Sequence, residues 1–441
     1  MNNKQSDNPI VATKLILSIC FGYGLLMLCR TVVGVAGPAM LADPTLSIDT
    51  ATFGAILGWG TAGNLMGKVT TGALADKIGG SKIFISAIFF AAIATFIFGT
   101  LSTNSAFFVL YFLTVFAKAA GWPSIANIIR ASFSENRHGR IWGFIATSSR
   151  ISSVATTLLA SSLLLIFSWR GMFFSAGILT LLIAAVLIKT LKEPKKELHD
   201  SVQPADADNP TSLDDEVSAP HPLKTLKTRE AIGHFIRSPR FWLISLGVSA
   251  LAVLFEFQVF LPIYLSETYD LAPAYAGIAS STFSLGCLVA VFSGGFIYDK
   301  LTKKSLIYAL GLSLTLAVAS LLLLRVLGDQ GSTGTLELTL TVLLIFLFGF
   351  AISPAYYIPM SVFSISFGGR HCGLLVGLID AIAYFGAMSF DFIGGAVANK
   401  EGGWQDFILI LIVTSVLATI IMTTFLYLDY RHSRQSNARA Y

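Results

Sequence analysis

The chain has 441 residues, of which 54% are hydrophobic and only 12% are charged. Soluble domains carry about 25% charged residues, so this composition excludes an ordinary soluble protein and predicts a polytopic membrane protein. The net charge of +5 comes from lysines and arginines gathered in loops, and we therefore expect no nucleic-acid partner. The four cysteines have neither metal-site nor CxxC spacing, so we expect no metal site, no cofactor and no disulfide framework.

Twelve stretches are long and apolar enough to cross a membrane as helices, which takes about 20 mainly apolar residues. We expect one kinked helix where Pro354 and Pro359 fall inside an apolar stretch, because neighbouring groups re-satisfy the backbone in membrane helices. The pattern predicts an all-α membrane protein with twelve transmembrane helices. The expected segments are 14–41, 51–75, 83–102, 105–130, 141–167, 171–190, 240–266, 273–298, 305–327, 336–366, 372–398 and 404–428.

A polar segment, 191–238, divides the twelve stretches into six and six. It mixes acidic residues with lysines, and its only structural signal is a short amphipathic piece at 224–237. We therefore predict an N-terminal six-helix bundle over 1–190, a linker over 191–238, and a C-terminal six-helix bundle with a short tail over 239–441.

Basic residues predict the orientation, because cytoplasmic loops of membrane proteins carry an excess of Lys and Arg. With the N-terminus inside, the inner loops and tails collect most of these residues, whereas the outer loops carry few and several acids. Both termini and the linker are thus expected on the cytoplasmic side. The first helix lacks a cleavage site, which fits a multi-pass plasma-membrane protein and, best, a bacterial inner membrane. The inner basic residues are Lys77, Lys82, Arg137, Arg140, Lys300, Lys303, Lys304 and Arg370.

One motif occurs twice. The chain reads Gly72-Ala73-Leu74-Ala75-Asp76-Lys77 after the second helix and Gly295-Phe296-Ile297-Tyr298-Asp299-Lys300 after the eighth. A glycine allows close helix approach, and the Asp can accept backbone N–H groups or pair with a base across the loop. Each copy alone fits an ordinary basic turn. Two copies at corresponding places predict conformational latches formed by Gly72, Asp76, Lys77, Asp299 and Lys300.

This repeated loop resembles the signature of the major facilitator superfamily. The resemblance covers essentially the whole chain and implies two bundles related by a pseudo-two-fold axis, with a midplane site between them. A narrower resemblance is to the organophosphate:phosphate antiporter family, the glycerol-3-phosphate transporter-like group. It rests on three segments of the N-terminal half: Phe21-Gly22-Tyr23 with Arg30, then Lys68, then Gly121-Trp122-Pro123.

Arg30 is the most informative residue. A permanently charged guanidinium within an apolar helix is unfavourable by about 3 kcal/mol, and its planar fork matches phosphate or carboxylate. Tyr23 lies two turns away on the same helix face. Lys68 adds a second cation at membrane depth. The alternatives are a static ion pair for Arg30 and a side chain that snorkels to the interface for Lys68.

The chain departs from the antiporter family at one important position. The family carries a second arginine on the seventh helix, where alignment through Pro262-Ile263-Tyr264-Leu265 places Leu254 in this chain. A symmetric two-arginine phosphate site is therefore not expected. Arg150, on a Ser-rich stretch of the fifth helix, is either a replacement anion ligand or the partner of an acid. Tyr356 and Tyr357, beside the two prolines, are candidates to line the site.

The C-terminal half supplies acids at membrane depth. Glu256 and Asp380 are candidates for proton coupling, because intramembrane acids commonly form proton relays; each could instead pair statically with a base. For Asp391, near the outer end of its helix, we expect a structural role. The two functional candidates would bind a positive group, carry a proton, or neutralise Arg30 when the site is empty.

The sequence thus predicts a secondary active transporter, not an enzyme, because it contains no nucleophile–base pair, metal cluster or nucleotide loop. The expected cargo is a small anionic or zwitterionic organic solute, an organophosphate or carboxylate. It would move by alternating access, by proton symport or by exchange against phosphate, in a monomer within the lipid membrane. The alternatives are an exporter of an anionic metabolite or siderophore, and a transporter-like solute sensor.

Overall fold

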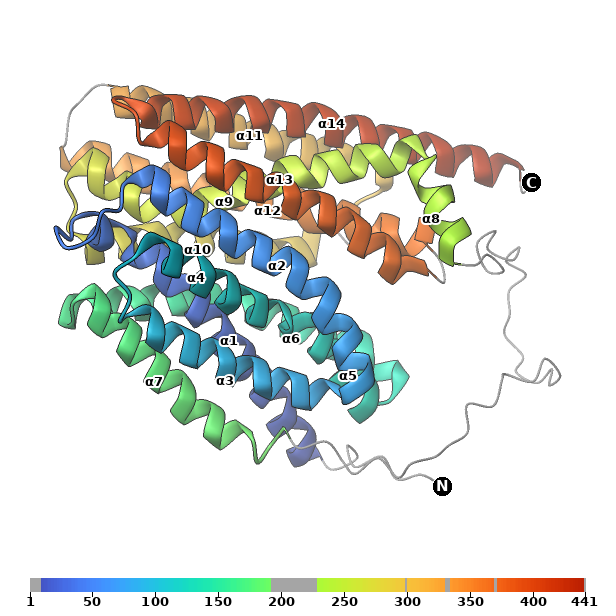
Figure 1. Cartoon of the computed structure of the whole chain (residues 1–441). Helices are drawn as coiled ribbons and strands as arrows, with labels where there is room; N and C mark the ends of the chain where they lie inside the picture. Colours follow the sequence, from blue (N-terminus) through green and yellow to red (C-terminus); the bar gives the residue numbers. More distant parts are fainter. Residues whose placement is uncertain (1–8, 192–227, 298–299, 330–333, 369–370, 440–441) are drawn as a thin grey trace.

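The structure is a computed structural model that describes residues 9–191, 228–297, 300–329, 334–368 and 371–439. Within these ranges the chain is all-helical, with no strand, as the sequence predicts. Figure 1 shows long helices in two groups, one from each half of the chain. Most of the predicted linker lies outside the described residues. The amphipathic piece expected at 224–237 is a short helix, α8 (Thr228–Ile236).

All twelve predicted apolar segments are helical. The N-terminal half contains α1 (Pro9–Leu41), α2 (Thr50–Ile78), α3 (Gly80–Phe98), α4 (Asn104–Ala119), α5 (Gly121–Ser132), α6 (Glu135–Ile166) and α7 (Trp169–Leu187). The C-terminal half contains α9 (Pro239–Tyr269), α10 (Pro273–Ile297), α11 (Lys303–Asp329), α12 (Thr335–Gly368), α13 (Cys372–Ala398) and α14 (Gly403–Arg439). The segment with two prolines is one helix, α12, as expected.

The fourth predicted segment is interrupted at Ala120, between α4 and α5. The cause is Pro123, whose ring clashes with the carbonyl of Ala119 and which lacks a backbone N–H. The N–H of Ala120 instead bonds to the carbonyl of Ala117 at 3.0 Å, in a tight turn. Together α4 and α5 form a single crossing, 104–132.

Eleven segments among the described residues are apolar and long enough to span a membrane. The twelfth crossing, α2, falls below that hydropathy because it is rich in glycine and threonine. Its polarity is tolerated because it packs between α4 and α13. Small residues let these backbones approach closely, which is how helices associate in membranes.

The two halves meet in a symmetric pattern. The second crossing of the N-terminal half, α2, packs on α13, the fifth of the other half. Reciprocally, the fifth crossing of the N-terminal half, α6, packs on α10, the second of the other half, and α1 meets α9 between them. This exchange is the pseudo-two-fold relation that the resemblance to the major facilitator superfamily implies.

The halves approach closely at the end of the interface opposite the start of α1 and the end of α14 (Figure 1). At the joined end Gly54 of α2 faces Gly395 of α13, and a Cβ built on Gly54 would lie 2.6 Å from the Gly395 Cα. The interactions of Asp76, towards the termini, stay within the N-terminal half. The fold therefore closes one end of the interface between the halves.

Candidate functional site

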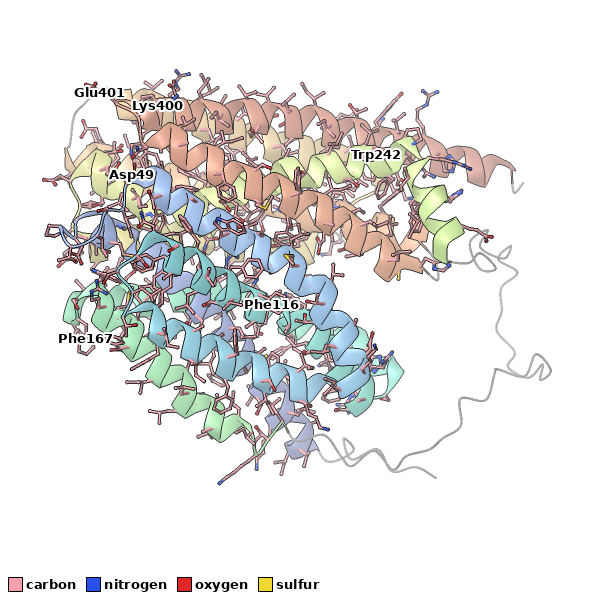
Figure 2. All side chains as sticks on the ribbon, in the orientation of Figure 1. Asp49, Phe116, Phe167, Trp242, Lys400 and Glu401 are labelled. Carbon is pink, nitrogen blue, oxygen red and sulfur yellow. The ribbon has the colours of Figure 1, made fainter. Side chains whose placement is uncertain are left out.

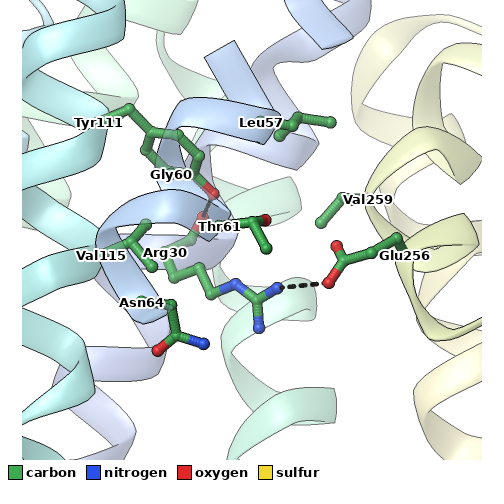
Figure 3. Close-up of a pocket in the computed structure, with 9 residues that line it drawn as sticks. All are labelled: Arg30, Leu57, Gly60, Thr61, Asn64, Tyr111, Val115, Glu256 and Val259. Carbon is green, nitrogen blue, oxygen red and sulfur yellow. Dashed lines mark hydrogen bonds and ion pairs between the residues drawn. The ribbon is translucent and has the colours of Figure 1, made fainter. Parts of the chain in front are cut away.

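Arg30 and Glu256 meet at the centre of this interface. The guanidinium of Arg30, on α1, lies 3.5 Å from the carboxylate of Glu256, on α9, as Figure 3 shows. Glu256 is only 6% exposed, and the two side chains bring opposite charges together at membrane depth, where isolated charges are unfavourable. The sequence prediction that an acid of the second half faces Arg30 agrees with this contact.

The pair borders a small pocket (Figure 3) of about 10 Å³, room for about one water molecule. The hydroxyl of Tyr111 donates to the carbonyl of Arg30 at 3.4 Å and fixes this part of α1. In this conformation the pocket is collapsed around the ion pair. Its lining residues are Arg30, Leu57, Gly60, Thr61, Asn64, Tyr111, Val115, Glu256 and Val259.

A second ion pair joins the halves nearer the termini. The ammonium group of Lys68, on α2, donates to the carboxylate of Asp380, on α13, at 2.5 Å. It also lies 4.3 Å from the centre of the Tyr384 ring, in cation–π contact. Lys68 is thus held inward across the interface, and the snorkelling alternative does not describe its position.

Arg150 meets an aromatic ring instead of an acid. Its guanidinium lies 4.2 Å from the centre of the Tyr357 ring, across the interface. Tyr357 packs against Tyr356, with ring centres 4.8 Å apart, and both contact Phe255. The predicted cation and the two predicted tyrosines therefore form one cluster, in which the Arg150 guanidinium has no hydrogen bond to the part of the chain that the structure describes.

Asp391 is fully buried and also bridges the halves. Thr61 of α2 donates to one of its oxygens at 2.6 Å. Its other oxygen has no hydrogen-bond partner among the described residues. The structural role expected for Asp391 is consistent with the Thr61 bond, but the unpartnered oxygen makes it a third buried acid of the interface.

Tyr23 packs within its own half. Its ring lies 5.2 Å from that of Trp122, on α5, and a Cβ on Gly121 would approach the Tyr23 ring to 3.0 Å. The Gly-Trp-Pro motif therefore forms the packing surface for Tyr23. Gly121 leaves room for the ring, Trp122 packs against it, and Pro123 interrupts the helix.

Leu254, which stands where the related family has a second arginine, is fully buried in the hydrophobic core. Gln258, four residues further along the same helix, donates to Ser284 at 2.7 Å and approaches Ser153 of the other half at 3.4 Å. The C-terminal half thus contributes acids, an amide and hydroxyls to this interface, as the departure at Leu254 predicts.

In the first loop, the structure describes the contacts of the residues predicted to form a latch. The carboxylate of Asp76 accepts a hydrogen bond from Asn127 at 3.0 Å and lies 3.9 Å from the guanidinium of Arg130, both on α5. A Cβ on Gly72 would have ordinary contact only, 3.9 Å from Pro123, so close packing does not require a glycine there. Lys77 is exposed.

In the second loop, Lys300 is also exposed, and Asp299 lies outside the described residues. The latch function of both loops stays a prediction.

A polar cluster at the joined end was not foreseen. Asn399, at the end of α13, donates to Asp49 at 2.9 Å and accepts from the N–H of Thr50 at 3.1 Å. Glu267 accepts from the Thr50 hydroxyl at 3.3 Å and from Trp404 at 2.7 Å. We call these five residues the end clasp. Its residues come from four separate loops and helix ends, so no local motif in the sequence marks it.

Figure 2 places Asp49 beside the loop that carries Lys400 and Glu401. Asp49 also caps α2, and hydrogen bonds donated by Thr52 lower the pKa of its carboxyl below the ordinary value. The carboxyl therefore stays ionised through physiological pH, and as an acceptor it keeps its bond to Asn399. Protonation of Asp49, which requires a pH below the ordinary carboxyl pKa, would weaken only the bond to Asn399 within the end clasp.

Comparison with known proteins agrees with this architecture. The family model described as Major Facilitator Superfamily matches residues 19–366 and 257–440. The chain belongs to the Major Facilitator Superfamily. A bacterial homologue of the human lysosomal transporter Spinster, in an inward-facing and unoccupied conformation, superposes with a TM-score of 0.73 at 15% identity, covering 96% of this chain and 98% of that one. At this identity the superposition shows the fold.

Curated members of the superfamily are similar along most of the chain. A probable hexose phosphate transport protein of Chlamydia trachomatis is 22% identical, over 92% of this chain and 89% of its own length. A probable galactarate/D-glucarate transporter of Bacillus subtilis is 23% identical, over 89% and 86%. The membrane sensor protein UhpC of Escherichia coli is 23% identical, over 93% and 91%. These relatives agree with the resemblance to the organophosphate antiporter group.

Proposed function

We propose that this superfamily member moves a small organic anion across the membrane, coupled to a proton. One observation carries the proposal: the cations Arg30, Lys68 and Arg150 belong to the N-terminal half, and their partners belong to the C-terminal half. An oxyanion is the ligand that can take the place of a carboxylate beside a guanidinium or ammonium group. Tyr23, Tyr356 and Tyr357 would shape the site around it.

The pairing suggests how binding drives the transport cycle. In the empty carrier Glu256 neutralises Arg30 and Asp380 neutralises Lys68, so the halves can reorient without exposing a bare charge. An anion that enters displaces a carboxylate from its cation. The displaced carboxylate, in a site of low polarity, becomes more favourable in its protonated form. Uptake of one proton then restores the charge balance and permits reorientation.

The relatives suggest the chemical class of the solute. Their names indicate hexose phosphates, glycerol-3-phosphate and galactarate or D-glucarate, all anionic derivatives of polyols or sugars. The single interfacial Arg30, with Leu254 in place of a second arginine, favours the proton-coupled uptake of such an anion over exchange against phosphate. We further propose that the ends with the termini face the cytoplasm, in a bacterial inner membrane, so that this conformation is the inward-facing one.

Proteoliposomes distinguish the two modes of coupling. The purified chain is reconstituted, and uptake of radiolabelled hexose 6-phosphate or glucarate is measured with an inward proton gradient, with internal phosphate, or with neither. Uptake that needs the gradient and ignores internal phosphate supports symport. Uptake that needs internal phosphate and ignores the gradient rejects symport and establishes exchange.

Amide variants of the acids test the proton pathway. We expect Glu256→Gln or Asp380→Asn, whichever acid carries the proton, to exchange labelled for unlabelled solute but to accumulate it less than about twofold above equilibrium. The reason is that an amide cannot take the proton that couples the cycle. Glu337→Gln, at the start of α12, is the matched control and should accumulate solute like wild type. Normal accumulation by both interfacial variants would rule out these residues as proton carriers.

A sensor is the second candidate, favoured by the similarity to UhpC. In that case the chain would bind solute without moving it, and residues 200–220 would contact a signalling partner. Uphill uptake by the wild-type chain, unchanged after deletion of 200–220, rejects this candidate.

A further inference from the structure

Lys118 is a buried cation that the proposed transport cycle does not use. It lies in the last turn of α4, inside the N-terminal half, and is only 8% exposed. Within the described residues its ammonium group has no hydrogen bond and no ion pair. Of the other basic residues at the interface, Arg30 and Lys68 each have an acid, and Arg150 has the ring of Tyr357. Lys118 is therefore a buried basic group without a permanent partner among the described residues.

The helix geometry directs Lys118 toward the site of Arg30. Tyr111 and Val115 of α4 line the pocket beside Arg30, and Lys118 follows Val115 by three residues, on the same face of the helix. The charged groups that act on it electrostatically are Arg30, Lys68, Glu256 and Arg150. Lys118 thus faces the same central site, one turn further towards the termini.

A second group without a partner lines the pocket beside Arg30. Asn64 of α2 is 2% exposed, and its side-chain oxygen has no hydrogen-bond partner among the described residues. Buried polar groups are normally hydrogen-bonded, so each exception calls for an explanation. The amine of Lys118 and the amide oxygen of Asn64, neither bonded within the described residues, thus offer a donor and an acceptor for a polar ligand beside the Arg30–Glu256 pair.

We propose that Lys118 binds the anionic group of the transported solute together with Arg30. It thereby supplies the second cation that Leu254 cannot, and both cations come from the same half of the protein. This inference rests on the proposed function, and its ligand class is a solute with an oxyanion, either a phosphate monoester or a carboxylate. The oxyanion lies between Arg30 and Lys118, and Asn64 accepts a hydrogen bond from a hydroxyl of the solute.

A structural role for Lys118 predicts a different outcome. A cation near the end of a helix can stabilise the last carbonyl groups, and its removal would then lower the stability of the empty protein. A lysine held for a ligand is instead unfavourable in the empty protein, and its replacement should not destabilise it. The melting temperature without ligand therefore separates the two roles.

Calorimetry on the purified full-length protein tests the proposal. Binding of glucose 6-phosphate, glucarate, inorganic phosphate and uncharged glucose is measured for wild type, Lys118→Met, Lys118→Gln and Lys118→Arg. With the tightest-binding anion, Lys118→Met and Lys118→Gln are expected to weaken binding at least about 30-fold, as loss of one partner of a buried charge pair does. Lys118→Arg should bind within about fivefold of wild type, since it keeps the charge. Lys82→Met, at an exposed lysine, is the control for an unchanged site.

The outcomes separate the inference from the function on which it rests. Tighter binding of glucose 6-phosphate assigns the oxyanion to a phosphate monoester, and tighter binding of glucarate assigns it to a carboxylate. Either result supports the proposal when the neutral Lys118 variants bind that anion much more weakly than wild type. If Lys118→Met binds the anion within threefold of the wild-type affinity, the role of Lys118 is overturned, whereas the proposed transport function is not. A lower melting temperature of both neutral variants without ligand overturns it too. Failure of wild type to bind any of the anions rejects the proposed function itself.

Discussion

Arg30→Gln is expected to reduce uptake of the anionic solute at least about 100-fold, because the variant loses a charge-assisted bidentate contact of the kind that anchors oxyanions. The guanidinium of Arg30 lies 3.5 Å from Glu256 at the centre of the interface. Glutamine keeps part of the length and polarity of the side chain but not its charge. Initial rates in proteoliposomes, normalised to the amount of reconstituted protein, measure the effect.

The double variant Arg30→Gln with Glu256→Gln separates lost function from lost folding. The single variant leaves Glu256 buried without its partner, which typically destabilises a protein by about 3–5 kcal/mol. The second substitution removes that unpaired charge, so the double variant should melt near wild type and still fail to transport. Arg237→Gln, at an exposed arginine, should transport normally. Uptake by Arg30→Gln at the wild-type rate would remove Arg30 from the site.

Gly54→Leu is expected to stop transport by holding the joined end open. Gly54 faces Gly395 so closely that a Cβ would lie 2.6 Å from both the Gly395 Cα and the Asp391 carbonyl oxygen, distances that carbon and oxygen atoms do not tolerate. Backbone on both sides leaves a leucine no room, so α2 and α13 must separate. The protein should then populate the conformation that opens towards the end clasp.

A reporter cysteine makes this conformational shift measurable. Val259 lines the central pocket, and Val259→Cys, in a background with the four native cysteines replaced, reports access from each side. In Gly54→Leu a membrane-impermeant maleimide should label it from the side of the end clasp at least about tenfold faster, which corresponds to a population shift of about 1.4 kcal/mol. Gly143→Leu is the matched control, because nothing lies within 4 Å of that Cβ position. Unchanged labelling together with normal transport would refute the closure at Gly54.

The helices and the charged residues of the site could be predicted because their signals are local. An apolar run of about 20 residues has few alternatives to a membrane helix, and a charge such as Arg30 is rare enough within one to indicate function. Glu256 and Asp380 were found for the same reason. Their pairing was left open, since which acid faces which base depends on how two halves distant in sequence pack together.

The features that the sequence did not reveal depend on contacts between distant segments. The end clasp joins Asp49 to Asn399 and Thr50 to Glu267, residues that are ordinary polar positions in loops and at helix ends. The break at Ala120 did have a local signal in Pro123, which the continuous apolar pattern concealed. Lys118 had a signal as well, a single cation in the apolar stretch Phe116-Ala117-Lys118-Ala119, but its missing partner becomes evident only in the fold.

The segregation of bases in one half and acids in the other bears on how transport responds to the membrane voltage. Arg30 and Lys68 stay with the N-terminal half and Glu256 and Asp380 with the C-terminal half, so these two pairs displace almost no net charge when the empty carrier reorients, whereas Arg150, which contacts the Tyr357 ring, keeps its charge. Moving one elementary charge through 100 mV changes the free energy by about 2.3 kcal/mol. The two ion pairs therefore add no electrical work to that of the cargo: a monoanion with one proton contributes no net charge, and a dianion with one proton contributes one negative charge, which a negative interior drives out.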